Sequence, residues 1–304
     1  MLENIAVVIV TYNRKELILK NLKKVFEQKR KIDKIIIIDN HGNDNTEEYL
    51  IKNDIDFSII NYIYLNENIG GAGGFYTGVK IAYEEKYDWI ILMDDDGRPY
   101  DNNTFENLLK KAEELNLKST DKVMINSLVI EDENNLSFAL NGEKNIDKLN
   151  KKIEGGMVIG AINPFNGTLI SKGLVKEIGY PNKDFFIKGD EIDYTKRAIK
   201  ANAFVATIVD SLYYHPSIKG IKEWNIGNKD YIIYIESPWK EYYSVRNYVY
   251  MLTKEKNNKG ILKLLIKKFI YISICKCKKI STFKMVLKGY KDGKKGVLGV
   301  NVKP

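Results

Sequence analysis

Short runs of isoleucine and valine alternate with amphipathic segments along the first third of this 304-residue chain. The apolar runs lie at 5–10, 34–39, 59–66 and 88–94. Their length and their β-branched residues are typical of strands. Apolar residues recur at helical spacing in the segments between them, at 13–28, 44–53 and 71–85. Strands and helices that alternate in this way predict an α/β fold with a mostly parallel central sheet flanked by helices.

The second half of the chain has a less regular pattern. Further strands are predicted by apolar runs at 123–130, 157–165 and 203–210. Residues 190–202 have the periodicity of a helix. Composition does not change this picture, because 44% hydrophobic and 29% charged residues are typical of a globular chain. We expect one large α/β domain over 1–237 and a basic, mainly helical region over 238–304.

Charge is distributed unevenly along the chain. The net charge is +8, but residues 251–304 hold 15 lysines and two acidic residues, which gives them +13 and leaves −5 on the rest. The stretch 260–274 combines bulky apolar residues with Lys263, Lys267 and Lys268. A helix that packs on the α/β domain and shows a basic outer face is one interpretation. The segregation of charge favours the other, which is binding to an anionic membrane surface without spanning it.

Cysteine usage and the start of the chain bear on its location. Cys275 and Cys277 form neither a CxxC pair nor a zinc-binding spacing, which favours a reducing, cytoplasmic setting. The first residues show no export signal, and no stretch reaches about 18 consecutive apolar residues. We therefore expect a soluble or peripheral protein.

Polar clusters follow the predicted strands of the first half at their carboxyl ends. They lie at 11–14, 39–44, 66–74 and 94–97. Ligands of open α/β sheets bind at this edge, so we expect four loops to converge on one site. The last cluster places Asp94, Asp95 and Asp96 directly after a buried strand, where three carboxylates repel one another unless a cation compensates. Asp94 and Asp96 suit a divalent cation shared with a diphosphate, and a solvated turn is the alternative.

The glycine-rich stretch at 68–78 matches neither of the well-known phosphate-binding fingerprints. A GxGxxG phase from Gly71 meets Tyr76, and a GxxxxGK phase from Gly73 meets Val79. This argues against a dinucleotide dehydrogenase and against a P-loop ATPase. Two interpretations remain, because the glycines either let a helix pack closely at its start or let its backbone N–H groups face a sugar or phosphate.

A second acidic cluster holds Asp190, Glu191 and Asp193. These residues fit the acidic first turn of a helix, which the helix dipole favours. Alternatively, one of them is a general base that takes a proton from an acceptor hydroxyl. Histidine is scarce, and His215 follows a predicted strand, where its imidazole fits a metal site built mainly of carboxylates and phosphate. His41 lies in a polar turn and is interpreted as a surface residue.

Six motifs follow one another along the chain: VVIVTYNR, IIIIDNHGNDNT, NENIGGAGGF, WIILMDDDG, FFIKGDEIDYTKRA and YYHP. Together they resemble the family 2 glycosyltransferases of the GT-A fold. Four motifs narrow the resemblance to the galactofuranosyl and rhamnosyl transferases of bacterial surface polysaccharides. They are NIGGAGGF, MDDDG, YYSVRN at 242–247 and KGYKDGKKG at 288–296. The resemblance covers nearly the whole chain.

The resemblance implies an inverting transfer from a nucleotide-activated sugar, with Mn²⁺ or Mg²⁺ on the diphosphate. It divides the catalytic domain into a nucleotide-sugar half at about 1–100 and an acceptor half at about 101–237. The donor site would consist of Thr11, Asn13, Arg14, Asp39, Asn68, Gly71, Asp94 and Asp95. The metal ion would be held by Asp94, Asp96 and His215. The acceptor or the diphosphate would be contacted by Asp193, Trp224 and Arg246.

One departure from the family pattern concerns the base. Where the galactofuranosyl group commonly shows Trp-Asp-Asp, this chain has Gly189, Asp190 and Glu191. The alignment puts Glu191 in the position of the usual base, with Asp190 beside it as the second catalytic candidate, and a carboxylate of similar pKa can do the same work.

The resemblance predicts a metal-dependent enzyme at the cytoplasmic face of the membrane that moves galactofuranose from UDP-galactofuranose onto a growing, lipid-linked cell-surface glycan. The alternatives are a dTDP-rhamnose donor, a nucleotidyltransferase and a non-catalytic sugar-binding protein. We expect no nucleic-acid partner, and a homo-oligomer stays open.

Overall fold

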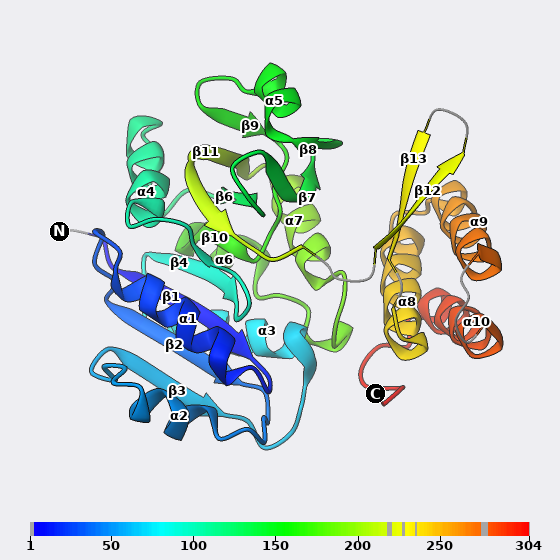
Figure 1. Cartoon of the computed structure of the whole chain (residues 1–304), viewed down its shortest axis with the longest axis horizontal. Coiled ribbons are helices and arrows are strands. Elements are labelled where there is room, and N and C mark those ends of the chain that lie inside the picture. The colour runs from blue at the N-terminus through cyan, green and yellow to red at the C-terminus, as the bar shows by residue number, and fades with distance from the viewer. Residues whose placement is uncertain (1–2, 218–220, 227–228, 235, 275–278, 304) are drawn as a thin grey trace. The chain divides into compact units, whose positions relative to one another are not determined.

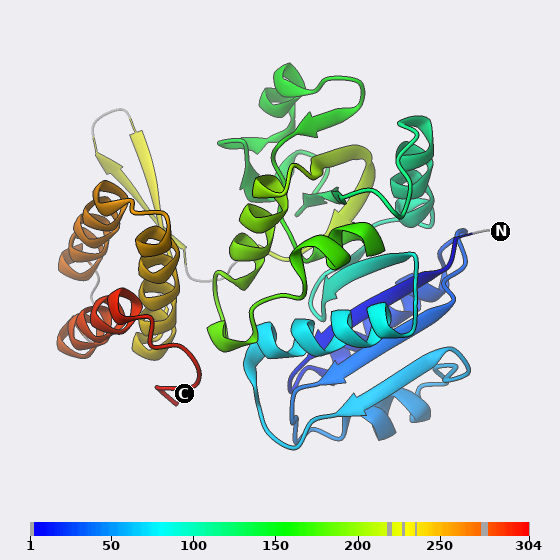
Figure 2. The same ribbon diagram turned by 180° about the vertical axis from the view of Figure 1, so that it is seen from behind.

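Figures 1 and 2 show the chain, as a computed structural model, from two opposite sides. The described residues are 3–217, 221–226, 229–234, 236–274 and 279–303, and their side chains are described except at 221–234 and 274. The chain forms two compact units. The first holds 1–181 and 194–217, and the second holds 182–193 and 218–304.

The first unit is built on a β-sheet whose first half is parallel. β1 (Ile5–Thr11) pairs with β2 (Lys34–Asp39) on one side and with β4 (Trp89–Asp94) on the other, and β3 (Ile60–Tyr64) pairs with β2. Side chains of these strands alternate between two apolar clusters, so both faces of the sheet are buried. The strands expected between 5 and 94 are confirmed.

Helices cover both faces of this sheet (Figures 1 and 2). One face is covered by α1 (Lys15–Phe26), α2 (Thr46–Lys52) and α4 (Thr104–Glu114). The other face is covered by α3 (Gly70–Glu84), α6 (Lys172–Ile178) and the part of α7 (Asp190–Lys200) from Tyr194 onward. This arrangement confirms the expected α/β architecture.

The second half of the unit makes the sheet mixed. β10 (Asn166–Ser171) lies antiparallel between β4 and β6 (Val123–Ile130), and β11 (Phe204–Tyr214) runs parallel to β6. β5 (Arg98–Pro99) pairs with the end of β11. The remaining elements are β7 (Asn135–Leu140), β8 (Glu143–Asn145), α5 (Ile146–Leu149), a 3₁₀ turn at Asn150–Lys152, and β9 (Met157–Ile159). The strand prediction at 157–165 is wrong beyond Ile159, and β10 lies outside every predicted strand.

Two glycines of α3 explain how closely this helix approaches the sheet. A Cβ atom on Gly74 would lie 2.5 Å from Val10 Cγ1, and one on Gly78 would lie 2.3 Å from Val8 Cγ1. Alanine at either position would therefore force α3 away from β1. The interpretation of the glycine-rich stretch as a close-packing site is confirmed for these two residues, whereas a Cβ on Gly71 would meet open space.

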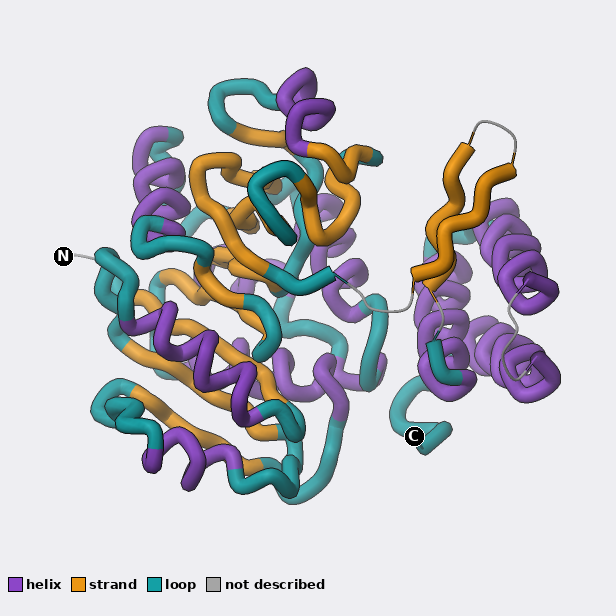
Figure 3. Tube along the Cα trace, viewed as in Figure 1, coloured by secondary structure: helices purple, strands orange, loops and turns teal. Residues whose placement is uncertain are grey.

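The second unit is mainly helical (Figure 3). Helices α8 (Pro238–Lys254), α9 (Asn258–Ile274) and α10 (Lys279–Lys295) enclose an apolar cluster to which each contributes. The unit also contains the hairpin of β12 (Ile221–Ile226) and β13 (Lys229–Tyr234) and a 3₁₀ turn at Lys183–Phe185. Its bounds differ from the region expected at 238–304 because 182–193 and 218–237 also belong to it, and the roles assigned to the two expected domains stay predictions. In the described part of the chain, no helix combines the length and apolarity needed to cross a membrane.

Candidate active site

Asp94, Asp95 and Asp96, the aspartate triplet, lie at the carboxyl end of β4, where the parallel half of the sheet ends in polar loops. Asp94 is the last residue of β4 and is in register with Val10 of β1. Burial is the main reason that the pKa of Asp95 is raised to about 6. Burial, followed by the charges of Asp96 and Asp95, raises the pKa of Asp94 as well. Burial therefore disfavours the ionised forms of Asp94 and Asp95, which lie beside a third carboxylate, that of Asp96.

Arg14 is the cation that the protein itself supplies to the triplet. Its Nη1 donates to Asp95 Oδ1 at 2.9 Å and to Asp96 Oδ2 at 2.8 Å. Thr11 Oγ1 donates to the second oxygen of Asp95 at 2.9 Å. Both residues reach the triplet because β1 ends at Thr11 and α1 begins four residues later. The side chain of Arg14 is 48% exposed, so it is also open to an anionic ligand.

His215 reaches the triplet from the end of β11. Its Nε2 lies 3.2 Å from Asp96 Oδ1, and its Nδ1 donates to the carbonyl oxygen of Pro216 at 2.7 Å. In the neutral ring this tautomer presents the Nε2 lone pair to the carboxylate, and two acceptors that face each other need a proton or a cation between them. Burial alone would lower the pKa of His215, but its hydrogen bond and charge interaction with Asp96 raise it. Burial alone would raise the pKa of Asp96, but its hydrogen bond and charge interaction with His215 lower it.

Two residues that the sequence analysis missed support the triplet. Asn21 of α1 is fully buried, and its Nδ2 donates to the carbonyl oxygens of Asp94 at 3.0 Å and of Gly97 at 2.7 Å. Tyr213 of β11 packs against Gly97, on which a Cβ would lie 2.4 Å from the tyrosine ring. The available signals were an asparagine on the apolar face of α1 and a tyrosine two residues before His215 on the same strand.

Two predicted donor-site residues, Asp39 and Asn13, form hydrogen bonds in the loops after β1 and β2. Asp39 is 2% exposed and accepts hydrogen bonds from Gly42 N at 2.8 Å and from the hydroxyl of Tyr62. Asn13 Oδ1 accepts from Asn43 N at 2.6 Å. These bonds hold both loops at the same edge of the sheet as the triplet. Contact of Asp39 and Asn13 with a nucleotide stays a prediction.

The loop before α3 is shaped by two asparagines. Asn68 Oδ1 accepts from Gly70 N at 2.9 Å, and Asn40 Oδ1 accepts from Ile69 N at 2.9 Å. Both bonds satisfy backbone groups at the start of α3, where helices leave N–H groups without partners inside the helix. Gly71 follows with open space beside its Cα. The predicted contacts of Gly71 and Asn68 with the donor are compatible with these positions and stay predictions.

The second acidic cluster lies in the second unit, at the end of a strained loop. Phe186, Lys188 and Gly189 have φ angles of +64°, +67° and +89°. Such angles cost a non-glycine residue about 1–3 kcal/mol. α7 begins directly after the loop, with Asp190 and Glu191 in its first turn. Backbone strain is therefore concentrated immediately before the predicted base.

Two fully buried side chains of α8, those of Arg246 and Asn247, hold this loop. Asn247 Nδ2 donates to three carbonyl oxygens, those of Phe185 at 3.0 Å, Ile187 at 2.9 Å and Lys188 at 2.7 Å. Arg246 donates to the carbonyl oxygens of Asp184, Phe185 and Gly299. These bonds explain why residues 182–193 belong to the helical unit. Asn247 was missed because its role depends on backbone carbonyls that no sequence pattern marks.

The structure bears on Arg246 and Trp224, two of the residues predicted to contact the acceptor or the diphosphate. The guanidinium of Arg246 is buried and bonded to backbone carbonyls. Its predicted contact with the acceptor or the diphosphate stays a prediction. Trp224 belongs to β12, and its side chain lies outside the described residues.

The acids at the start of α7 are tied to the loop before them. Glu191 Oε2 accepts from Gly189 N at 2.9 Å, and Asp193 N donates to Gly189 O at 2.8 Å. Asp190 is 6% exposed. Burial and the charge of Glu191 raise the pKa of Tyr248 in α8 to about 12. The helix-start interpretation of these acids is confirmed, and their roles in proton transfer or acceptor binding stay predictions.

The chemistry of the donor set at the triplet fits a divalent cation. Asp94 and Asp96 supply carboxylate oxygens, and the bond to Pro216 orients His215 as metal-binding histidines commonly are. Among the side chains that the structure describes, no three histidines, cysteines or acids are already gathered into a metal site. A cation here would therefore take further ligands from the phosphates of a nucleotide, as Mg²⁺ commonly does.

Comparison with known proteins assigns this geometry to a family. The model described as glycosyl transferase family 2 matches residues 6–174, which is more than half of the chain. Galactofuranosyltransferase GlfT1 of Mycolicibacterium smegmatis is 29% identical over 272 residues, which cover 86% of this chain and 86% of that protein.

Solved structures share the fold at low sequence identity. Mannosyltransferase PcManGT from Pyrobaculum calidifontis, in complex with GDP-Man and Mn²⁺, matches 97% of this chain and 83% of its own with a TM-score of 0.56 and 12% identity. GalNAc-T7, solved with UDP, GalNAc and Mn²⁺, matches 83% of this chain with a TM-score of 0.55 and 14% identity, and this chain spans 48% of its length. These likenesses confirm the GT-A fold. The chain belongs to glycosyl transferase family 2, and the protein is a glycosyltransferase.

Proposed function

We propose that the enzyme transfers galactofuranose from UDP-galactofuranose onto a growing cell-surface glycan, with inversion at the anomeric carbon. The similarity to galactofuranosyltransferase GlfT1 along 86% of the chain supports this donor. The observation that carries the proposal is the acidic edge at Asp94–Asp96, where three carboxylates meet one arginine, Arg14, and one histidine, His215. Such an edge suits a diphosphate that arrives with a cation.

Donor binding would use the polar edge of the first unit. The nucleoside would lie against the loops that hold Asp39, Asn68 and Gly71. Mn²⁺ or Mg²⁺, held by Asp94, Asp96 and His215, would supply Lewis-acid stabilisation of the departing diphosphate. Arg14 adds a fixed positive charge beside Asp95 and Asp96. Asn21 and Thr11 keep the triplet in place through the hydrogen bonds that they donate to it.

The transfer step needs a base for the acceptor hydroxyl, and we assign this role to Glu191, with Asp190 as the second candidate. The acceptor oxygen forms a bond to the anomeric carbon while the bond from that carbon to the diphosphate oxygen breaks. The hydroxyl proton passes to Glu191, and UDP leaves with the electron pair. The bond from Gly189 N orients the Glu191 carboxylate. Asp193, in the same helical turn, would contact the acceptor.

A lipid-linked acceptor would place the enzyme at the cytoplasmic face of the membrane as a peripheral protein. The charge of +13 on residues 251–304 supports this location, because anionic lipids attract lysines.

A donor panel tests the proposed reaction. The purified protein receives UDP-galactofuranose, UDP-galactopyranose or dTDP-rhamnose, each with Mn²⁺, Mg²⁺ or a chelator, and both nucleotide release and transfer to a glycan acceptor are measured. We expect turnover of UDP-galactofuranose that requires a divalent cation. Faster turnover of dTDP-rhamnose would show that dTDP-rhamnose, and not UDP-galactofuranose, is the preferred donor. Undiminished turnover with the chelator would remove the metal from the mechanism.

A further inference from the structure

α9 carries apolar residues on two opposite sides. One side faces the inside of the second unit, where Ile261, Tyr271 and Ile272 are buried. The other side is exposed, and its apolar residues recur at the spacing of a single helical stripe: Leu262, Ile266, Phe269 and Ile270. Packing within the unit accounts for the first side only.

α10 continues this stripe into a patch. The rings of Phe269 and Phe283 lie 5.7 Å apart between centroids, and Ile280, near the start of α10, is 75% exposed. We define the apolar patch as Leu262, Ile266, Phe269, Ile270, Ile280 and Phe283. Of the 14 large apolar side chains that are exposed in the described part of the chain, six lie in this patch. Exposed apolar residues that are gathered in this way mark an interaction surface, whereas single ones are ordinary.

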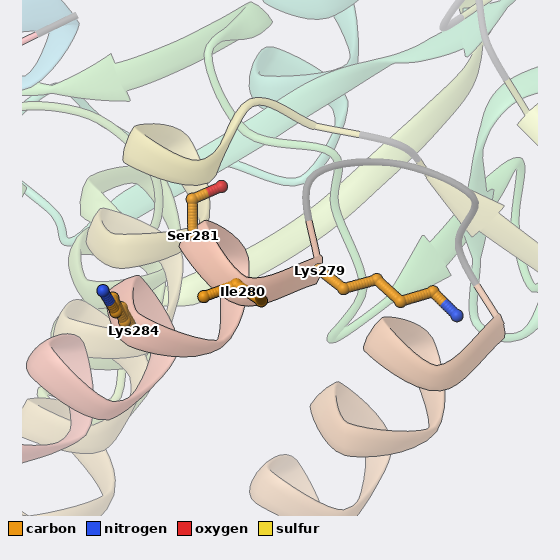
Figure 4. Close-up of a pocket in the computed structure, with 4 residues that line it drawn as sticks. All are labelled: Lys279, Ile280, Ser281 and Lys284. Atoms are coloured by element: carbon orange, nitrogen blue, oxygen red, sulfur yellow. The ribbon is translucent and has the colours of Figure 1, made fainter.

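Lysines border the apolar patch on both helices. Lys259, Lys263 and Lys267 are exposed along one flank of the stripe on α9, and the sequence of this helix contains no acidic residue. On α10, Lys279 and Lys284 line a hollow of about 490 Å³, and their side chains extend in opposite directions from the start of the helix (Figure 4). We call these five lysines the basic border.

One lysine that the sequence analysis placed with this group lies elsewhere. Lys268 forms an ion pair with Glu241 of α8, which is 3% exposed. It therefore neutralises a buried acid inside the unit. The basic border is narrower than the lysine content of 260–274 suggests, and it lies beside the exposed stripe.

We propose that the apolar patch and the basic border dock on the surface of an anionic phospholipid bilayer. The apolar side chains enter the interfacial region, and the lysine stems let their ammonium groups remain at the level of the lipid phosphates. Charge complementarity selects anionic over zwitterionic lipid. This surface gives the proposed peripheral location a physical basis, but it does not depend on the proposed donor or base.

A second copy of the chain fits this surface less well. A two-fold interface brings the same patch of both copies together. The basic border would then face a second basic border, and the sequence of α9 supplies no acid to pair with it. Like charges across an interface oppose association. A bilayer removes this conflict because its charge has the opposite sign.

Vesicle binding by the full chain tests the proposal. Vesicles of phosphatidylcholine alone are compared with vesicles that contain about one third phosphatidylglycerol, and bound protein is measured by sedimentation. We expect binding to the anionic vesicles only, weakened by raised salt. Replacement of Lys259, Lys263 and Lys267 by alanine should weaken it about a hundredfold, at about fivefold for each lysine. Ile266→Glu with Phe269→Glu should weaken it tenfold or more, because charged side chains cannot enter the interface.

Matched variants in the first unit serve as controls. Lys20, Lys23 and Lys52 are exposed lysines, and Ile51 is 57% exposed on α2. A triple alanine variant of these lysines and Ile51→Glu should both bind vesicles as the unchanged chain does. Variants of the patch should retain nucleotide release from the donor in the absence of vesicles, so failed docking and failed catalysis are separate results.

Two results would overturn the proposal. The first is equal vesicle binding by the unchanged chain and the Ile266→Glu, Phe269→Glu variant, or binding that ignores lipid charge. The second is a dimer in sedimentation velocity that the same two substitutions dissociate, with no vesicle binding by either protein. The second result would assign the patch to a contact between copies of the chain.

Discussion

Replacement of Asn247 by alanine tests whether α8 holds the loop that precedes the predicted base. The asparagine is fully buried, and its amide donates to the carbonyl oxygens of Phe185, Ile187 and Lys188. Its Oδ1 also accepts from Arg246 Nε at 2.8 Å. Alanine at this position removes every one of these bonds and leaves buried polar groups without this partner.

The size of the effect follows from the groups that lose a partner. The amide has two N–H donors, and each buried carbonyl that loses one of them costs about 1.5 kcal/mol because it is left unsatisfied. The closed loop should therefore lose about 3 kcal/mol, which corresponds to about a hundredfold increase in local opening. The strain at Phe186 and Lys188 favours opening in both proteins, so it does not enter the difference.

Amide hydrogen exchange in the full chain measures this opening. Peptides that cover 182–193 should exchange about a hundredfold faster in Asn247→Ala. Because the proposed donor site lies in the first unit, nucleotide release to water should persist, whereas kcat for transfer should fall with an unchanged donor KM. Asn53→Ala is the control, because Asn53 Nδ2 donates to Tyr49 O at 2.8 Å in α2 of the first unit. Unchanged exchange of 182–193 in Asn247→Ala would refute the holding role of this residue.

Three further predictions concern the triplet, the base and the sheet. Asp96→Asn should lower turnover at least a hundredfold and raise the cation concentration that turnover requires, since it removes a charged ligand of the proposed cation; normal turnover with a chelator would contradict this. Glu191→Gln should still bind donor in calorimetry but lose transfer by a factor of about 10²–10⁴. An inactive Asp190→Asn beside an active Glu191→Gln would move the base by one residue. Burial alone would raise the pKa of Asp88, but its hydrogen bonds lower it, and the one from Lys172 has the largest lowering effect. The resulting stability is complete above the unfolded pKa of about 3.9 and is lost as pH falls through the folded pKa. Denaturant unfolding should show Asp88→Asn less stable by about 2 kcal/mol near neutral pH and by less below about pH 3. An equal deficit at both values would exclude the ionised form of Asp88 as the cause.

Three strands of the parallel half, β1, β2 and β4, could be predicted because they are buried on both faces. Such strands are nearly continuous runs of isoleucine and valine, and polar loops mark their carboxyl ends. The triplet could be placed at that edge for the same reason. The sequence left two interpretations of the glycine-rich stretch open, and the contacts of Gly74 and Gly78 with β1 are what favour close packing at these two positions.

The rest of the fold was hidden by polar residues in buried positions. β10 contains Thr168, whose hydroxyl donates to Asn126 of β6 inside the sheet, so its pattern is not that of an apolar strand. Asn21 and Asn247 act on backbone carbonyls far away in the sequence. Hydrogen bonds of this kind depend on which segments meet in space, and no local spacing records them.

The position of β10 also determines the order in which the nascent chain can complete its sheet. β4 ends at Asp94 and β6 ends at Ile130, yet the strand that lies between them begins only at Asn166. Synthesis at about 5–20 residues per second separates β4 from this partner by about 4–14 s. During that interval one edge of β4 has no strand to pair with, and an unpaired edge is open to pairing with another chain. The strand that ends in the predicted metal ligand Asp94 thus gains its second neighbour only after Ser171 has left the ribosome.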